Sequence, residues 1–154
     1  TMSKTGKKTS KRRKQNQDCF TVIDTYLNME NQMFLGVFDG HGPNGGLVSR
    51  YCREHLPKKL QRFISNDGSI ELCEKKKKLN EAIRNACFET NKQLTNSTID
   101  VYVSGTTCIS AIICNKKVYT INIGDSRAVM GKVINGKLKS VDLSDDQKPD
   151  RPVS

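Results

Sequence analysis

An acid and an imidazole stand two residues apart where an apolar run ends. Residues 34–38 are Phe, Leu, Gly, Val and Phe, and Asp39, Gly40 and His41 follow directly. A short apolar run of this kind is typical of a buried strand. The end of such a strand would place both side chains over one cleft. Asp-Gly is also a common turn sequence, so a tight turn with a solvent-facing His41 is an equal alternative.

Three acids stand at the ends of predicted β segments. Asp18 begins one segment, Asp39 ends another, and Asp125 lies in a turn further along the chain. The three carboxylates could therefore converge on one edge of a sheet, where divalent cations such as Mg²⁺ or Mn²⁺ would relieve their repulsion. Two such ions can hold a hydroxide and clamp the oxygens of a phosphate. The alternative is that these acids are ordinary turn formers, which Asp125 fits most easily.

Two further side chains suit phosphoester hydrolysis. His41 would be placed to protonate the leaving alkoxide. Arg13, five residues before Asp18, could offer a forked donor to phosphate oxygens. Spacing alone leaves the hydrolytic and the turn interpretations open.

The glycines after the apolar run also match a dinucleotide-binding fingerprint. Gly40, Gly42 and Gly45 have the required spacing between a predicted strand and a predicted helix. That fold needs a second buried strand ending in an acid about 20 residues later, whereas residues 55–65 predict more helix. Pro43 would also withhold a backbone N–H from the phosphate-binding turn. The pattern therefore disfavours dinucleotide binding.

The elements that must position these side chains follow from the apolar pattern. A strand over residues 20–27 should turn at 28–31 and pair with a strand over 33–38. A helix over 48–56 follows, which Pro57 ends or separates from a second helix, then a loop at 66–68 and a helix over 79–94. Strands are predicted at 106–114, 118–123, 127–134 and 138–143, with a hairpin turn at Asn135-Gly136. This order predicts an α+β fold, with helices on a mostly antiparallel sheet.

The composition fits one domain of 154 residues, 35% of them hydrophobic. The net charge of +10 suggests nucleic-acid binding, but the charge gathers in residues 4–14 and 75–78. The aromatic content is only 6% and no recognition motif occurs, which disfavours that class. Residues 1–12 are predicted to be a disordered basic arm, either a solvated tail or a nuclear address. No apolar run approaches the roughly 20 residues of a membrane helix.

Six cysteines occur without any C-x-x-C pair. Their spacing makes a zinc site unfavourable, and most fall within apolar strand or helix patterns. We therefore expect buried free thiols in a reducing, intracellular compartment, the cytoplasm or the nucleus.

Several separate motifs carry a family resemblance. Residues 37–42 read Val-Phe-Asp-Gly-His-Gly, residues 104–107 read Ser-Gly-Thr-Thr, and residues 122–129 read Asn-Ile-Gly-Asp-Ser-Arg-Ala-Val. Asn-Gln-Asp at 16–18 and Leu-Ser-x-Asp-x-Lys-Pro at 143–149 agree in order and spacing. Together they resemble the metal-dependent protein phosphatases of the PP2C (PPM) family, in the form of the plant-type branch that also occurs in protists. The match covers residues 13–154, which would be the N-terminal part of the catalytic domain.

The resemblance implies a β-sandwich of mostly antiparallel strands in α-β-β-α layers, incomplete at the C-terminus. It implies two divalent cations, Mg²⁺ or Mn²⁺, at one end of the sandwich. Asp39 would bridge both ions, the Gly40 carbonyl would bind one, and Asp18 would hold an ion or act on its bound water. Asp125 would lie near a third, weaker metal site.

By the same resemblance, His41 is the general acid and Arg13 binds the substrate phosphate. The reaction would be hydrolysis of phosphoserine and phosphothreonine in phosphoprotein substrates, by a monomer without a membrane or nucleic-acid partner. Gln17 and Gln147 depart from residues common elsewhere in the family. The family's remaining metal-binding aspartates would follow residue 154. An inactive, phosphatase-like regulatory module is the alternative, and a nucleic-acid binder is a less favoured one.

Overall fold

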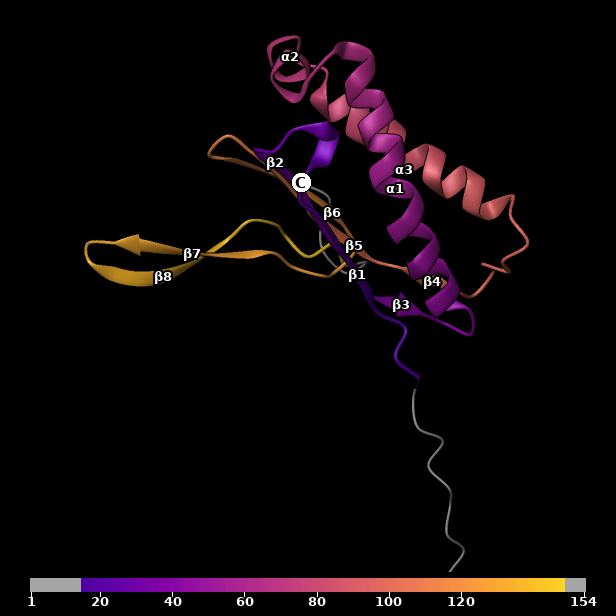
Figure 1. Cartoon of the computed structure of the whole chain (residues 1–154). Coiled ribbons are helices and arrows are strands. Elements are labelled where there is room, and N and C mark those ends of the chain that lie inside the picture. Colours follow the sequence, from indigo (N-terminus) through magenta and orange to yellow (C-terminus); the bar gives the residue numbers. More distant parts are fainter. Residues whose placement is uncertain (1–14, 149–154) are drawn as a thin grey trace, which may run out of the picture.

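A four-stranded antiparallel sheet organises the part of the chain that the structure describes. The structure is a computed structural model, and residues 15–148 of it are described. The strand order is β1-β2-β5-β6, so the predicted hairpin between the first two strands is confirmed. These strands are β1 (Cys19–Ile23), β2 (Gln32–Phe38), β5 (Cys108–Cys114) and β6 (Lys117–Ile123) (Figure 1).

Helices cover one face of this sheet (Figure 1). They are α1 (Gly45–Asp67), α2 (Ile70–Lys75) and α3 (Leu79–Thr95). Alternate side chains of the strands meet the apolar sides of the helices, because successive residues of a strand point to opposite faces. The fully buried core includes Phe34, Phe38, Leu60, Ile64 and Ile112. The α+β prediction is confirmed.

Pro57 does not interrupt α1, contrary to the sequence-based expectation. The helix continues from Gly45 to Asp67 with Pro57 inside it. Leu56, Pro57 and Leu60 are all buried, so packing against the sheet outweighs the local cost of a mid-helix proline, about 3 kcal/mol. Tyr26 adds a hydrogen bond, its hydroxyl donating to the Pro57 carbonyl at 2.7 Å.

The first strand is shorter than predicted, and Tyr26 lies beyond its end. β1 ends at Ile23, and a short 3₁₀ turn, η1 (Tyr26–Asn28), follows it. Tyr26 is only 1% exposed and its ring lies 5.3 Å from that of Phe34, centroid to centroid. Tyr26 therefore packs in the core from a turn instead of extending the strand.

The four consecutive lysines at 75–78 span the last residue of α2 and the three residues that connect it to α3. The sequence pattern missed α2, because six residues are too few to show a helical period. Ser69 caps α2 by accepting a hydrogen bond from the Leu72 N–H at 3.2 Å. Lys76 and Lys78 both pair with Asp67, so a local carboxylate offsets their charge near the start of α3.

The strand predicted over residues 106–114 is two strands. β4 (Gly105–Thr106) pairs with β3 (Gly40–His41) in a separate two-stranded sheet. Thr107 separates β4 from β5, since its N–H donates to the Asp39 carbonyl at 2.9 Å. This break moves Gly105 beside His41, where the register pairs the two residues.

The last two strands form the predicted hairpin, β7 (Val129–Ile134) and β8 (Lys137–Asp142). Asn135 and Gly136 both have positive φ, at 52° and 73°, as a two-residue hairpin turn requires. The start of β7 faces the side of the main sheet away from the helices, across a hollow lined by Leu35, Val37 and Ile109. A second layer thus begins on that side.

Two further observations bear on the sequence-based expectations. All six cysteines are free, as expected, but only Cys73, Cys108 and Cys114 are buried and the other three are partly exposed. Within residues 15–148, no helix is both long enough and apolar enough to cross a membrane.

Candidate active site

Strand pairing brings Asp18 and Asp39 together. Cys19, the first residue of β1, pairs with Phe38, the last residue of β2. Asp18 and Asp39 are the next residues beyond that pair, so they meet at the same edge of the sheet. Their side chains are within hydrogen-bonding reach of each other. Two ionised carboxylates this close repel each other, and a bound cation would relieve that repulsion.

The pKa of Asp39 reflects this crowding. Asp39 is exposed, but loss of water around its carboxylate raises this pKa most, and interaction with Asp18 and then with Asp125 raises it further. His41 acts in the opposite direction. Four of the predicted site residues are therefore close enough to interact electrostatically, although they come from three separate parts of the sequence.

Gly40 allows the backbone beside Asp39 to pack closely. A Cβ atom at Gly40 would lie 2.6 Å from the carbonyl oxygen of Gln17, which no side chain could tolerate. Gln17 also donates from Nε2 to the Gly42 carbonyl at 2.8 Å. The hydroxyl of Ser49, which is fully buried in α1, donates to the Gln17 carbonyl at 2.6 Å. Helix α1 thus holds the segment that carries Asp18 against the segment that carries Asp39.

Thr107 connects Asp39 to the turn that carries Asp125. Its hydroxyl accepts a hydrogen bond from the Asp39 N–H at 3.2 Å and lies 2.6 Å from the hydroxyl of Ser126. The carbonyl of Asp39 accepts a second bond from the hydroxyl of Thr106 at 3.1 Å. The backbone of Asp39 is therefore fixed at both its N–H and its carbonyl.

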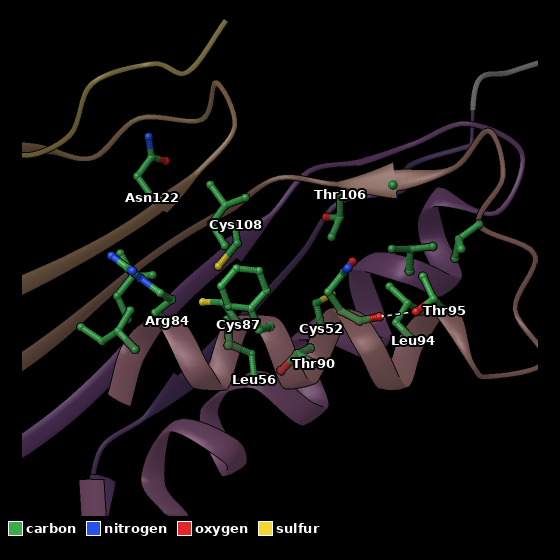
Figure 2. Close-up of a pocket in the computed structure, with 18 of the residues that line it drawn as sticks. Cys52, Leu56, Arg84, Cys87, Thr90, Leu94, Thr95, Thr106, Cys108 and Asn122 are labelled. Carbon is green, nitrogen blue, oxygen red and sulfur yellow. Dashed lines mark hydrogen bonds between the residues drawn. The ribbon is translucent and has the colours of Figure 1, made fainter. Parts of the chain in front are cut away.

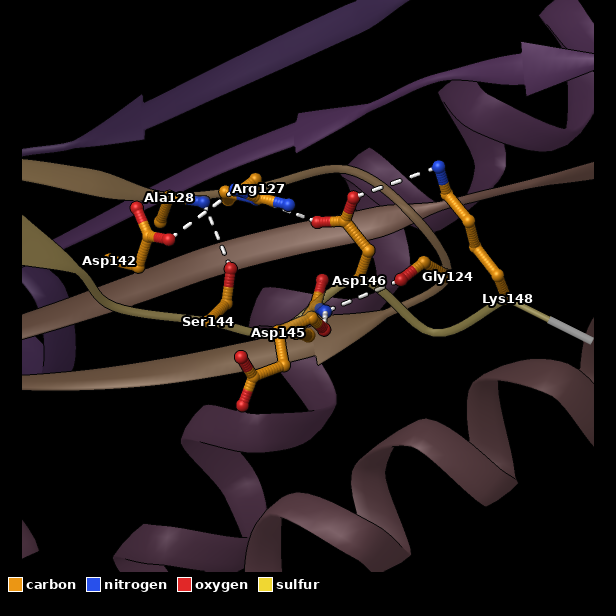
Figure 3. Close-up of polar contacts among 9 residues, drawn as sticks. Gly124, Arg127, Ala128, Asp142, Ser144, Asp145, Asp146 and Lys148 are labelled. Atoms are coloured by element: carbon orange, nitrogen blue, oxygen red, sulfur yellow. Dashed lines mark hydrogen bonds and ion pairs between the residues drawn. The ribbon is translucent and has the colours of Figure 1, made fainter. Parts of the chain in front are cut away.

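Residues 142–148 return to support the Asp125 turn (Figure 3). Gln147 makes two hydrogen bonds with Gly124. The Gly124 N–H donates to Gln147 Oε1 at 3.1 Å, and the Gln147 backbone N–H donates to the Gly124 carbonyl at 2.9 Å. Arg127 donates to Asp146 at 2.8 Å and to Asp142 at 3.3 Å. Strand β7 begins at Val129 and not at 127 as predicted, because the Ala128 N–H donates to the Ser144 hydroxyl at 3.0 Å instead of to a strand partner.

Gly105 sets the position of the His41 ring. A Cβ atom at Gly105 would lie 2.7 Å from His41 Nε2, so the imidazole lies directly against this glycine. Pairing of β3 with β4 places the two residues side by side. His41 is exposed, which leaves its ring free to meet a substrate beside Asp39.

Two sequence-based predictions have different outcomes: the role of Arg13 is untested, and dinucleotide binding is excluded. Arg13 lies outside the described residues. The dinucleotide interpretation is wrong, because β2 pairs antiparallel with both of its neighbours and a parallel strand–helix–strand unit is required.

Sequence reasoning gave no role to Thr107, Ser126 or Ser49. Thr107 and Ser126 were present only as motif positions, in Ser-Gly-Thr-Thr and Gly-Asp-Ser, and Ser49 lies in no motif. Their function as hydrogen-bonding supports depends on long-range register, which spacing along the chain does not reveal.

The donor set suits a hard divalent cation. Carboxylate oxygens of Asp18 and Asp39 are the ligands that Mg²⁺ and Mn²⁺ prefer, and their mutual repulsion is what such a cation would relieve. Within residues 15–148, no group of three His, Cys, Asp or Glu side chains is already arranged to hold a metal ion. The described acids therefore fit part of a metal site.

Comparison with known families decides the chain's membership. The family model described as protein phosphatase 2C matches residues 3–153. The chain belongs to the protein phosphatase 2C family.

Relatives and solved structures agree with this membership. The chain is 36% identical over 138 residues to probable protein phosphatase 2C 35 of Arabidopsis thaliana, a match covering 90% of this chain and 37% of the relative. It is 34% identical to probable protein phosphatase 2C 64 of Oryza sativa subsp. japonica, over 89% of this chain and 32% of the relative. The chain thus spans about a third of the curated relatives that it matches.

Among solved structures, serine-threonine phosphatase 2C from Toxoplasma gondii superimposes with a TM-score of 0.67 at 25% identity, covering 91% of this chain and 48% of that one. A bacterial serine phosphatase gives a TM-score of 0.62 at 26% identity, covering 88% of this chain and 57% of the other. The protein phosphatase 2C fold is therefore confirmed for this chain, and the PP2C resemblance with it.

Proposed function

We propose that this chain supplies the N-terminal part of the catalytic domain of a metal-dependent protein serine/threonine phosphatase, a hydrolase. The observation that supports this best is the pairing of Asp18 with Asp39 at the edge of the sheet, with Asp125 and His41 in electrostatic range. These acids have no cationic partner among residues 15–148. Their mutual repulsion destabilises the fold, and a bound cation would relieve it.

Two divalent cations, Mg²⁺ or Mn²⁺, are proposed at this edge. Asp39 and the Gly40 carbonyl would hold them, with Asp18 binding one ion or its water and Asp125 serving a third, weaker site. Bound cations would lower the pKa of water and neutralise phosphate charge. The role of Thr107 is to keep Asp39 fixed, since its hydroxyl and N–H bind both backbone groups of that residue.

His41 is proposed as the general acid. Its imidazole is exposed and held against Gly105, so it can donate a proton to the oxygen of the departing serine or threonine. Arg13 is proposed to bind the phosphate oxygens, as a planar, permanently charged donor would. The substrates would be phosphoproteins, and the protein a monomer acting in the cytoplasm or the nucleus.

The proposal is tested by replacing Asp39, the carboxylate proposed to hold both cations. In the full-length protein, Asp39→Asn should reduce Mn²⁺-dependent hydrolysis of a phosphothreonine peptide by at least about 100-fold. Glu74→Gln is the matched control, because Glu74 is also an exposed acid but pairs with Lys117 at 2.7 Å. Activity that survives Asp39→Asn in the presence of a chelator would contradict the proposal.

A further inference from the structure

A cavity lies directly behind the strand pair that holds His41. It has a volume of about 790 Å³ and lies between α1, α3 and the strands β4, β5 and β6. Its walls are largely apolar, with Leu56, Ile83, Phe88 and Ile121 among them. This size and lining fall in the range of sites for small organic ligands.

One charge faces this cavity. Arg84, on α3, is the only charged residue among the lining residues that the structure describes, and no acid is among them. Arg84 has no ion pair or hydrogen bond within residues 15–148. In Figure 2, Arg84 and Cys87 rise from α3 toward the sheet, from which Cys108 points back. A guanidinium at the rim of an apolar cavity suits a carboxylate, sulfonate or similar anion.

We infer that this cavity binds a compact amphipathic organic anion, with its charge on Arg84 and its apolar body among the side chains of α1, α3 and β6. Gly105 and Thr106 of β4 also line the cavity, and Gly105 supports the His41 ring from the other side. An occupant would therefore press on β4 and shift His41. Any effect on catalysis rests on the proposed function, whereas binding and the movement of His41 do not.

The probe for binding is 8-anilinonaphthalene-1-sulfonate, a fluorescent amphipathic anion. N-phenyl-1-naphthylamine has the same rings without the sulfonate and serves as the neutral control. We expect Arg84→Gln to weaken binding of the sulfonate by about fivefold to tenfold, and to change binding of the neutral probe by less than about twofold. Lys92→Gln, on α3 but outside the cavity lining, should change neither, and Arg84→Lys should be intermediate.

Alkylation locates the bound probe. Cys87 lines the cavity and Cys19 does not, so saturating sulfonate should slow the reaction of N-ethylmaleimide with Cys87 and leave its reaction with Cys19 unchanged.

The side-chain NMR signals of the two histidines test whether an occupied cavity moves His41. We expect the signal of His41 to shift and that of His55 to stay in place. Equal loss of binding in Arg84→Gln and Lys92→Gln, or no protection of Cys87, would overturn the site. An unmoved His41 signal would overturn the coupling, and neither result depends on phosphatase activity.

Discussion

Carboxylates at the two ends of the main sheet have pKa values shifted in opposite directions. At one end, which we term the acid edge, Asp18, Asp39 and Asp125 lie near His41, and the pKa of Asp39 is raised by loss of water around its carboxylate and by its acidic neighbours. No cationic side chain pairs with these three acids within residues 15–148.

At the other end, which we term the paired edge, Asp67, Glu71 and Glu74 each have a partner. The pKa of Glu71 is lowered chiefly by a hydrogen bond from the Cys114 thiol, and that of Glu74 by Lys117. The pKa of Asp67 is lowered chiefly by Lys78. The same residue types are thus stabilised at one end and crowded at the other, and crowding is what a cation-binding site requires.

The largest expected effect separates the chain's two histidines. His41 lies at the acid edge, whereas His55 stacks on Tyr51 in α1 at 4.1 Å between ring centroids. His41→Ala should reduce kcat of the full-length protein by about 100-fold or more, as loss of a general acid does. His55→Ala should leave kcat nearly unchanged. Equal activities of the two variants would contradict the claim that His41 acts in catalysis and His55 does not.

The next effect concerns the scaffold of the acid edge. Thr107→Val keeps the shape of the side chain but leaves the Asp39 N–H and the Ser126 hydroxyl without their partner. We expect the free energy of unfolding to fall by about 1–3 kcal/mol, measured by urea denaturation. Thr95→Val is the control, because the Thr95 hydroxyl bonds only carbonyls of its own helix, and should cost less than about 0.5 kcal/mol. Similar losses would show that Thr107 has no special supporting role.

The smallest effect is a difference in pH dependence. Asp39 binds its proton more tightly in the folded state, so its contribution to stability is complete below its ordinary pKa of 3.8 and is lost as the pH rises through the folded-state pKa. The contribution of Glu74 has the opposite sign, since its lowered pKa makes it stabilising above its ordinary pKa of 4.5 and lost as the pH falls through the folded-state pKa.

Without metal at pH 7, Asp39→Asn should therefore raise Tm by a few degrees, and Glu74→Gln should lower it. Thermal unfolding from pH 3.5 to pH 7 tests both signs. A lower Tm for Asp39→Asn would mean that Asp39 is paired like the acids of the paired edge.

The meeting of Asp18 and Asp39 at one end of the sheet was predictable, because the signals for it are local. Asp18 and Asp39 stand directly beside strands whose apolar pattern is clear, and antiparallel pairing brings such neighbours together. The hairpin turn at Asn135-Gly136 was predictable for the same reason.

The elements that the sequence failed to predict depend on distant contacts. Pro57 stays inside α1 because the helix packs against the sheet, and Thr107 breaks a predicted strand because its N–H reaches Asp39. Helix α2 is too short to show a period, and its cap at Ser69 is its main local signal. Local pattern therefore located the acids, whereas tertiary contacts determined how they are held.

The most direct measurement is Mn²⁺-induced broadening of backbone amide NMR signals in this chain. Binding should be weak, because few ligands surround each ion, but paramagnetic broadening still locates the ion. We predict that broadening centres on the amides of Asp18, Asp39, Gly40 and Asp125 and spares those of Asp67, Glu71 and Glu74. Broadening centred on the paired edge, or spread evenly over the acids of both ends, would contradict the account.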